Sequence, residues 1–200
     1  MNKEQVIALL KMGQVKQVKI AFDTNALESN DKFALLCNYI NQINDEFKYQ
    51  LQAIVPALAY FEKLHHLKHQ HKERFDLAGI FDGLKAKQVQ IMSFEPNHAE
   101  AVAALLYSQF LTKEAWQTAK IERCAKCLGI PTDNTSKNKS CSATIDWLIA
   151  GYAVAESCLL ITDDKGIEFK EISRKTNLKI LEQGLCELLS DNRALKASSN

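Results

Sequence analysis

The chain has 200 residues, of which 46% are hydrophobic and 24% are charged, a composition ordinary for a soluble globular protein. Its formal net charge of +1 excludes a general basic field that would attract nucleic acid. A polyanion would therefore have to be held by a local patch or by metal. The apolar stretch near the start, Val6 to Leu10, is too short for a membrane span and poor as a signal peptide.

The cysteines are scattered through apolar segments rather than forming a dense framework. In a chain of this size without a secretory signal, they are most simply reduced, partly buried thiols. The sequence therefore predicts a cytoplasmic protein that does not associate with membranes. The six cysteines are residues 37, 124, 127, 141, 158 and 186.

Helical and strand-like stretches alternate along the chain. Helices are predicted at residues 4–12, 32–45, 57–72, 97–111, 113–128 and 143–155, with another between the last two strands and a final helix through Leu189. Strands are predicted at residues 18–22, 51–55, 89–93, 158–161 and 178–181. Residues 131–142 hold no large apolar side chain, which indicates an exposed loop.

The alternation of strands and helices, without repeats or a convincing boundary, predicts one domain over residues 1–200. The predicted fold class is α/β: a three-layer α/β/α sandwich around a mostly parallel, roughly five-stranded sheet. Its core would span about residues 18–182. The helix at 4–12 would precede this core, and the polar loop at 131–142 would be inserted into it.

Two of the predicted strands run directly into acidic residues. The apolar run from Val18 stops at Asp23, and the run from Cys158 stops at Asp163 and Asp164. Such runs are typical of buried parallel strands, whose carboxyl ends meet at the sheet edge where open α/β proteins bind ligands. Acids from opposite ends of the chain would then meet at one edge, which suggests a metal site.

Two further acids are placed to join them. Glu62 lies two turns into the helix after the second strand, and Asp146 lies near the start of a helix whose N-terminus favours its ionised form. Four ionised carboxylates in one cleft repel each other unless a cation such as Mg²⁺ or Mn²⁺ neutralises them. Such ions can activate water and promote phosphodiester displacement. No histidine or cysteine cluster suits zinc, and the alternative is that these acids are helix caps or surface charges.

Around these four acids the sequence resembles the PIN-domain ribonuclease family and, within it, the VapC-like toxins of toxin–antitoxin pairs. The matching segments are IAFDTNAL around Asp23, IVPALAYFEKL around Glu62, IDWLIAGYAVAE around Asp146 and LLITDDKGIEF around Asp164. Each segment alone is weakly specific, whereas the ordered set covers residues 18 to about 182. The chain differs from the compact toxins in its length, its N-terminal helix and the loop at 131–142.

The resemblance implies a five-stranded parallel sheet flanked by helices and a Mg²⁺- or Mn²⁺-dependent endoribonuclease, a hydrolase that cleaves RNA. It also implies a homodimer and, if the chain is a toxin, an antitoxin protein that blocks the acidic cleft. Carried over residue by residue, the catalytic metal ligands would be Asp23, Glu62, Asp146 and Asp164, with Asp163 as the alternative to Asp164. The residues that would shape the site through hydroxyl or amide hydrogen bonds are Thr24, Asn25 and Thr162.

The segment from Lys63 to Arg74 is basic and rich in histidine. It lies on the helix predicted to carry Glu62, so its cations are either RNA-phosphate contacts or an ordinary solvated helix face. The candidate RNA-binding residues are Lys63, Lys68, Lys72 and Arg74. His65 and His69 have the i,i+4 spacing of a metal pair but lack a matching third ligand. The pair Cys124 and Cys127 is most simply structural.

Two other functions compete with the nuclease. A phosphatase with Asp23 as nucleophile, as in haloacid-dehalogenase-like folds, would need an aspartate two residues on, where this chain has Asn25. The other alternative is a non-catalytic PIN-like module that binds RNA or scaffolds partners. The intact acids argue against that module.

Overall fold

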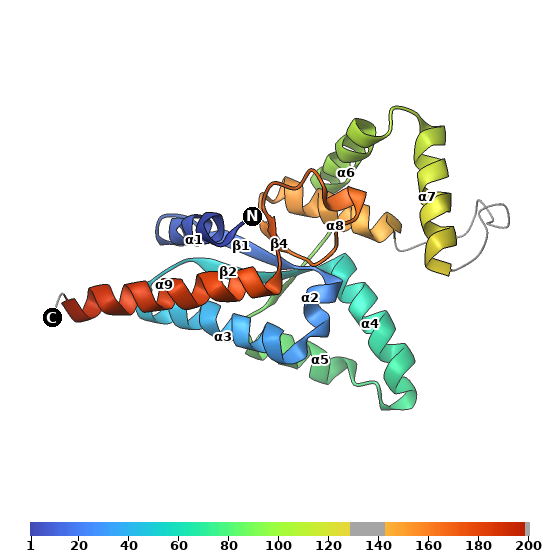
Figure 1. Ribbon diagram of the computed structural model, residues 1–200. Coiled ribbons are helices and arrows are strands. Elements are labelled where there is room, and N and C mark those ends of the chain that lie inside the picture. The colour runs from blue at the N-terminus through green and yellow to red at the C-terminus, as the bar shows by residue number, and fades with distance from the viewer. Residues whose placement is uncertain (129–142, 199–200) are drawn as a thin grey trace. The chain divides into compact units, whose positions relative to one another are not determined.

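The computed structural model describes residues 1–128 and 143–198 and contains a five-stranded, all-parallel sheet with the order β3-β2-β1-β4-β5 (Figure 1). The strands are β1 (Val18–Phe22), β2 (Leu51–Pro56), β3 (Gln90–Met92), β4 (Leu159–Ile161) and β5 (Lys175–Thr176). The α-helices are α1 (Lys3–Lys11), α2 (Thr24–Glu28), α3 (Asn30–Phe47), α4 (Ala57–His71), α5 (Leu77–Ala86), α6 (Pro96–Gln109), α7 (Lys113–Leu128), α8 (Ala143–Ala155) and α9 (Leu178–Ser198). Short 3-10 helices are η1 (Met12–Gln14), η2 (Lys72–Arg74) and η4 (Ile167–Phe169).

The predicted fold class is confirmed: the protein is α/β, with a five-stranded parallel sheet flanked by helices. The middle strands form where apolar residues run without interruption. Strand β4 is buried at every position, and β1 is buried at all positions except Lys19. Continuous apolar runs of this kind are typical of strands covered on both faces.

The described residues form two compact units. The first unit comprises Met1–Ser93, Ser157–Asp164 and Ser173–Asn200, and it holds all five strands. The second unit comprises Phe94–Glu156 and Lys165–Ile172, and it holds α6, α7, α8 and η4. Both segments of the second unit are inserted between strands of the first, one before β4 and one after it. One domain over the whole chain stays a prediction.

In the first unit, α9 packs along α3 and α1 (Figure 1). Its buried residues recur at helical spacing: Leu178, Leu181, Leu185 and Leu188. Gly184 lets α1 approach closely, because a Cβ built at this position would lie 3.1 Å from Cγ1 of Val6.

In the second unit, α6 packs against α8. A Cβ at Gly151 of α8 would lie 2.8 Å from the backbone nitrogen of Val102, so only glycine allows this approach. Aromatic rings hold α7 to α8, with Trp116 and Trp147 edge to face at 5.9 Å between ring centroids.

The predicted strand at residues 178–181 is wrong, because α9 begins at Leu178 and continues to Ser198. The fifth strand is instead Lys175–Thr176, in register with Leu160 and Ile161 of β4. The side chain of Asn177 accepts a hydrogen bond from the Ile180 N–H at 2.9 Å and caps the helix. The apolar residues at 178–181 are thus the first turn of a buried helix face.

The structure adds the helix α5 to those predicted from the sequence. Helix α5 was missed; its N-cap is Asp76, whose side chain accepts from the Gly79 N–H at 2.9 Å. The predicted loop at 131–142 lies outside the described residues, as do the side chains of Cys124 and Cys127. No helix in the two described ranges has both the length and the apolar character needed to cross a membrane.

Candidate metal centre

The strand order of the sheet reverses between β1 and β4. From β1 the chain continues through β2 to β3 on one side, whereas β4 and β5 lie on the other side. Phe22 and Ile161 are paired at the carboxyl ends of the two strands, and the N–H of Asp23 donates to the Ile161 carbonyl at 3.1 Å. Asp23 and Thr162 therefore leave the sheet side by side at its topological switch point, where open α/β sheets bind their ligands.

Asp23 is 3% exposed, and neighbouring donors fix its carboxylate. Its Oδ1 accepts the Thr24 N–H at 2.7 Å. Its Oδ2 accepts the Thr162 hydroxyl at 2.6 Å and the Asn25 amide at 3.1 Å. Donors at both oxygens hold the carboxylate in one orientation.

The same donors tie β1 to the segment after β4. The Asn25 amide nitrogen donates to Thr162 Oγ1 at 2.9 Å, and its oxygen accepts the Asp163 N–H at 3.2 Å. Thr162 Oγ1 also accepts the Asp164 N–H at 3.0 Å. These contacts are hydroxyl and amide hydrogen bonds, the type that the resemblance implies for Thr162 and Asn25. Their role in shaping an active site stays a prediction.

Two more acids of the first unit act on Asp23. The Thr24 hydroxyl donates to Glu62 Oε2 at 2.6 Å, which joins α4 to the end of β1. The pKa of Asp23 is raised from 3.8 to about 6, mainly by burial and in smaller part by the Glu62 and Asp164 carboxylates, while hydrogen bonds from Thr162 and Thr24 lower it. The structure thus places two of the predicted acids, Glu62 and Asp164, near the buried carboxylate of a third, Asp23.

The two neighbouring aspartates after β4 differ in their surroundings. Asp163 is exposed, whereas Asp164 is half-buried and its charge is felt by Asp23. The geometry therefore favours Asp164 over Asp163 as a ligand, in agreement with the choice made from the family pattern. Which of them binds metal stays a prediction.

The fourth predicted acid, Asp146, lies in the first turn of α8 in the second unit. There Arg123 of α7 donates through Nη2 to Asp146 Oδ2 at 2.7 Å, and its Nη1 pairs with the carboxylate of Glu168 in η4. Carboxylate oxygens of Asp146 and Glu168 lie within 4.8 Å of one another. The second unit therefore holds an acidic pair bridged by one guanidinium.

The sequence interpretation missed Arg123 and Glu168. Glu168 belongs to the LLITDDKGIEF segment, but a glutamate in a short polar stretch is usually a surface residue. The signal that could have singled it out is its place between Gly166 and the buried Phe169. No local pattern marks Arg123, because its partners come from other segments of the chain.

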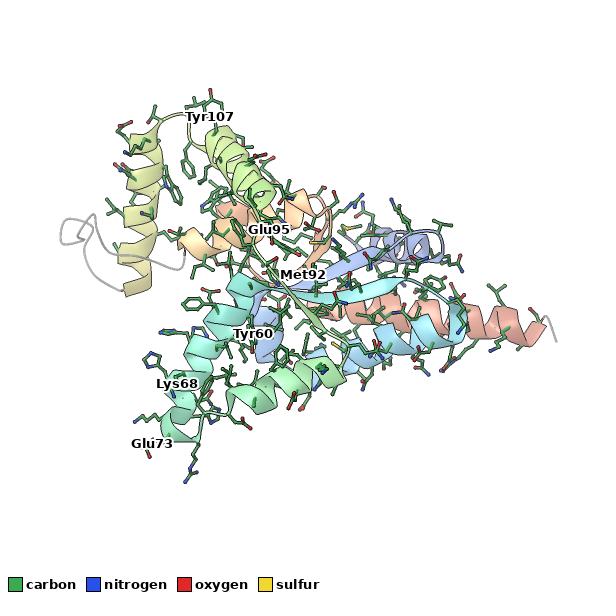
Figure 2. The ribbon with its side chains drawn as sticks, turned by 180° about the vertical axis from the view of Figure 1, so that it is seen from behind. Tyr60, Lys68, Glu73, Met92, Glu95 and Tyr107 are labelled. Carbon is green, nitrogen blue, oxygen red and sulfur yellow. The ribbon has the colours of Figure 1, made fainter. Side chains whose placement is uncertain are left out.

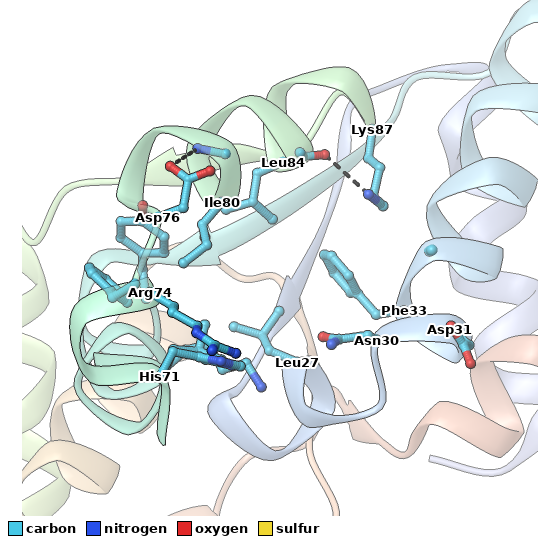
Figure 3. A pocket seen from close by; sticks show the side chains of 17 residues that line it. Leu27, Asn30, Asp31, Phe33, His71, Arg74, Asp76, Ile80, Leu84 and Lys87 are labelled. Atoms are coloured by element: carbon cyan, nitrogen blue, oxygen red, sulfur yellow. Dashed lines mark hydrogen bonds between the residues drawn. The ribbon is translucent and has the colours of Figure 1, made fainter. Parts of the chain in front are cut away.

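Two of the four candidate RNA-binding residues of α4 and η2 line one pocket. Lys63 and Arg74 line a pocket of about 590 Å³, in which Leu27 and Phe33 face α5 (Figure 3). Lys68 extends outward near the end of α4 and lies 5.1 Å from the Phe75 ring (Figure 2). Contact of these residues, and of Lys72, with RNA stays a prediction.

His65 and His69 of α4 contact each other through their rings. The Nε2 atoms of His65 and His69 are 3.1 Å apart, within hydrogen-bonding distance when one ring donates and the other accepts. Among the described residues, neither histidine belongs to a group of three side chains that could hold a metal ion.

No protein-family model matches the sequence, and no curated protein matches it. Among solved structures, a chain in the crystal structure of VapBC2 from Rickettsia felis bound to a DNA fragment from their promoter is 16% identical, with a TM-score of 0.40; the match covers 80% of this chain and 98% of that chain. A chain in a toxin-antitoxin complex from Klebsiella pneumoniae is 16% identical, with a TM-score of 0.38 and coverage of 80% and 97%. Values this low do not assign a function to the protein.

Proposed function

We propose that the protein is a metal-dependent endoribonuclease that hydrolyses RNA phosphodiester bonds at the carboxyl ends of β1 and β4. The observation that carries the proposal is the buried carboxylate of Asp23 at the topological switch point, with Glu62 and Asp164 beside it. Buried negative charges at one point are costly unless a cation is bound there. The PIN-domain resemblance of the same residues supports this reading.

The donor set fits Mg²⁺ or Mn²⁺. All the acidic groups offer oxygen ligands, which these hard cations prefer. The raised pKa of Asp23 also fits, because part of the rise comes from neighbouring carboxylates whose repulsion a cation would offset. When bound, the ion would lower the pKa of water and stabilise charge on the phosphate. Asp146 is proposed as a further ligand on the resemblance alone.

The surrounding residues would act by positioning. The Thr24 N–H, the Thr162 hydroxyl and the Asn25 amide hold Asp23 in one orientation, so little reorganisation is needed when a ligand binds. The Thr24 hydroxyl holds Glu62 in the same way. Lys63, Lys68, Lys72 and Arg74 are proposed to contact RNA phosphates.

The geometry is unfavourable for a phosphatase with Asp23 as nucleophile. Both carboxylate oxygens of Asp23 already accept hydrogen bonds, which lowers their nucleophilicity. The residue two positions on, Asn25, donates to Asp23 and accepts from the Asp163 N–H. An amide engaged in this way cannot transfer a proton to a leaving group.

The test is cleavage of a mixed single-stranded RNA pool with Mg²⁺, with Mn²⁺ or with EDTA, by the full chain and by Asp23→Asn. We expect cutting that needs metal and falls by at least about a hundredfold in the variant. A matched control is Asp45→Asn, an exposed aspartate near the end of α3, which should cut like the wild type.

Equal cutting by the wild type and Asp23→Asn would contradict the assignment of the site. If neither protein cuts while both remain folded, a non-catalytic module that binds RNA or scaffolds partners becomes the better explanation. RNA binding measured by fluorescence anisotropy would then separate these two roles.

The resemblance further leads us to propose that the chain is the toxin of a toxin–antitoxin pair, that it forms a homodimer and that an antitoxin protein blocks its acidic cleft. Induced expression of the wild type in a bacterial host should arrest growth, and expression of Asp23→Asn should not. Light scattering coupled to size-exclusion chromatography would report the dimer. Growth unaffected by a nuclease that is active in vitro would count against the toxin role.

A further inference from the structure

Three aromatic side chains lie along one exposed face of α4. Phe61, His65 and His69 follow each other at intervals of four residues, which places them on the same side of the helix. The Phe61 and His65 rings are stacked with 24° between their planes, and the His65 and His69 rings meet edge to face at 4.5 Å between centroids. Contact between successive rings therefore holds the two imidazoles next to each other.

The two imidazoles present the same atom to each other. Their Nε2 atoms are 3.1 Å apart. Imidazole nitrogens bind transition metals at about 2.0–2.1 Å, so an ion bound to both atoms at this separation would have an N–metal–N angle of roughly 95–100°. Neighbouring ligands of a tetragonal ion are about 90° apart. The pair therefore has the spacing of a bidentate ligand.

Small ring movements would complete the geometry. The last torsion of a histidine side chain is soft, so both Nε2 lone pairs can turn towards one ion. In the metal-free pair, the Nε2 of one ring donates to the Nε2 of the other. On metal binding, this proton would move to Nδ1 of the same ring, which leaves a lone pair on each Nε2.

The donor atoms select the class of ion. Two imidazole nitrogens suit Cu²⁺ and Ni²⁺, and Cu²⁺ binds such ligands most tightly among the divalent first-row ions. Zinc sites take three or four protein ligands, more than this pair supplies. Mg²⁺ and Mn²⁺ prefer oxygen ligands. The histidine pair therefore suits a different class of ion from the carboxylates around Asp23.

The other two histidines of α4 have different surroundings. Nδ1 of His66 lies 3.7 Å from the Glu28 carboxylate of α2, and His71 lines the pocket between α4 and α5. His65 and His69 are both exposed, so water can fill the remaining positions around an ion bound to them.

We propose that His65 and His69 form a bidentate site for Cu²⁺ or Ni²⁺ on the exposed face of α4, with water as the remaining ligands. The site goes beyond the proposed nuclease, because it uses none of the acids at the carboxyl ends of β1 and β4. A bound ion links two successive turns of α4 and so stabilises this part of the helix.

The experiment is titration of the full chain with Cu²⁺, followed by electron paramagnetic resonance, in which nitrogen nuclei bound to copper split the signal. We expect a signal split by two imidazole nitrogens. His65→Gln and His69→Gln should each weaken Cu²⁺ binding at this site by at least about tenfold, because the remaining imidazole loses a second nitrogen that binds intramolecularly. Calorimetry with Ni²⁺ should give the same order of affinities.

Matched controls come from the same helix. His66→Gln and His71→Gln each remove an exposed histidine and should leave the affinity and the nitrogen splitting unchanged. Asp23→Asn should also leave the two-nitrogen signal unchanged, which separates this site from the candidate metal centre. Circular dichroism checks the folding of each variant.

Unchanged Cu²⁺ affinity in His65→Gln or in His69→Gln would overturn the inference. Loss of the two-nitrogen signal in His66→Gln or His71→Gln would overturn it as well, since the ligands would then be a different pair. RNA cleavage by a protein that gives no two-nitrogen signal would retain the nuclease and reject this site. The expected signal without RNA cleavage would retain the site and reject the nuclease.

Discussion

Asp23 is a buried carboxylate whose ionisation opposes folding in the absence of metal. Its pKa is about 6 in the folded state against an ordinary value of 3.8, so the folded protein holds this proton more tightly than the unfolded chain. The stabilisation from the protonated form is complete below pH 3.8 and is lost as the pH rises through 6. A shift of this size corresponds to about 3 kcal/mol.

We therefore expect the free energy of unfolding of the wild type, relative to Asp23→Asn, to fall as the pH rises from 4 to 7. Urea unfolding at several pH values, with EDTA present throughout, measures this difference. The Asp23→Asn substitution also disturbs hydrogen bonds, but this effect does not depend on pH. It therefore does not change the slope of the free-energy difference against pH. Parallel pH profiles for the two proteins would show that Asp23 has an ordinary pKa.

Thr162 links the carboxyl end of β4 to Asp23. Its hydroxyl donates to Asp23 Oδ2 at 2.6 Å and accepts from the Asp164 N–H at 3.0 Å. The hydroxyl also accepts from the Asn25 amide at 2.9 Å. Thr162→Val keeps the shape but removes all three bonds, so we expect a loss of about 1–3 kcal/mol in unfolding free energy. Thr162→Ser should retain most of the stability. Similar losses for the valine and serine variants in urea unfolding would indicate packing of the methyl group as the cause.

The two aspartates after β4 can be separated by matched substitutions. Asp164 is half-buried and acts on the pKa of Asp23, whereas Asp163 is exposed. We expect Asp164→Asn to weaken Mn²⁺ binding by about tenfold or more, and Asp163→Asn to change it by much less. Isothermal titration calorimetry at neutral pH measures both. The reverse order would make Asp163 the ligand.

Helix α9 depends on close approach to α1 at a single glycine. The nearest atom to a Cβ at Gly184 would be Cγ1 of Val6, at 3.1 Å, so a large side chain must push the helices apart. Gly184→Leu should lower the unfolding free energy by about 1–3 kcal/mol. The control is Gly83→Ala in α5, where an added Cβ would meet nothing within 4 Å. Because alanine favours the helix more than glycine does, this substitution should raise the unfolding free energy. Equal effects of the two changes on thermal unfolding would contradict the packing argument.

The sequence predicts correctly the strands whose position follows from their own apolar residues. Strands β1, β2 and β4 are apolar runs that are almost entirely buried, so their positions follow from composition alone. Strand β5 is different, because Lys175 and Thr176 are in a strand only through their register with β4. The apolar residues at 178–181 fit the spacing of a strand and of a helix equally. The N-cap hydrogen bond to the Asn177 side chain favours the helix.

The part of the candidate site that follows directly after a strand could be predicted from the sequence. Asp23, Asp164 and Thr162 follow from the rule that carboxyl ends of parallel strands meet at one edge. The Arg123–Glu168 pair could not be predicted in this way, since its members lie in segments separated by a strand. Charged residues in helices and short loops usually face solvent, so only tertiary structure shows which are buried.

At the scale of the whole molecule, metal binding should appear as added stability. A ligand that binds only the folded state at a hundred times its dissociation constant contributes about 2.7 kcal/mol. For a chain of this length, this corresponds to a rise in Tm of about 5–10 °C. We expect such a rise with Mn²⁺ in differential scanning calorimetry and its reversal by EDTA.

The pH dependence of this rise provides a sharper test. A carboxylate must be ionised to bind the cation, and Asp23, with a pKa of about 6, is protonated at pH 5 in the folded protein. The Mn²⁺-induced rise in Tm should therefore be larger at pH 8 than at pH 5. It should be strongly reduced in Asp23→Asn at pH 8 and unchanged in Asp45→Asn. A rise of equal size at both pH values and in Asp23→Asn would mean that the cation stabilises the fold at acids other than Asp23.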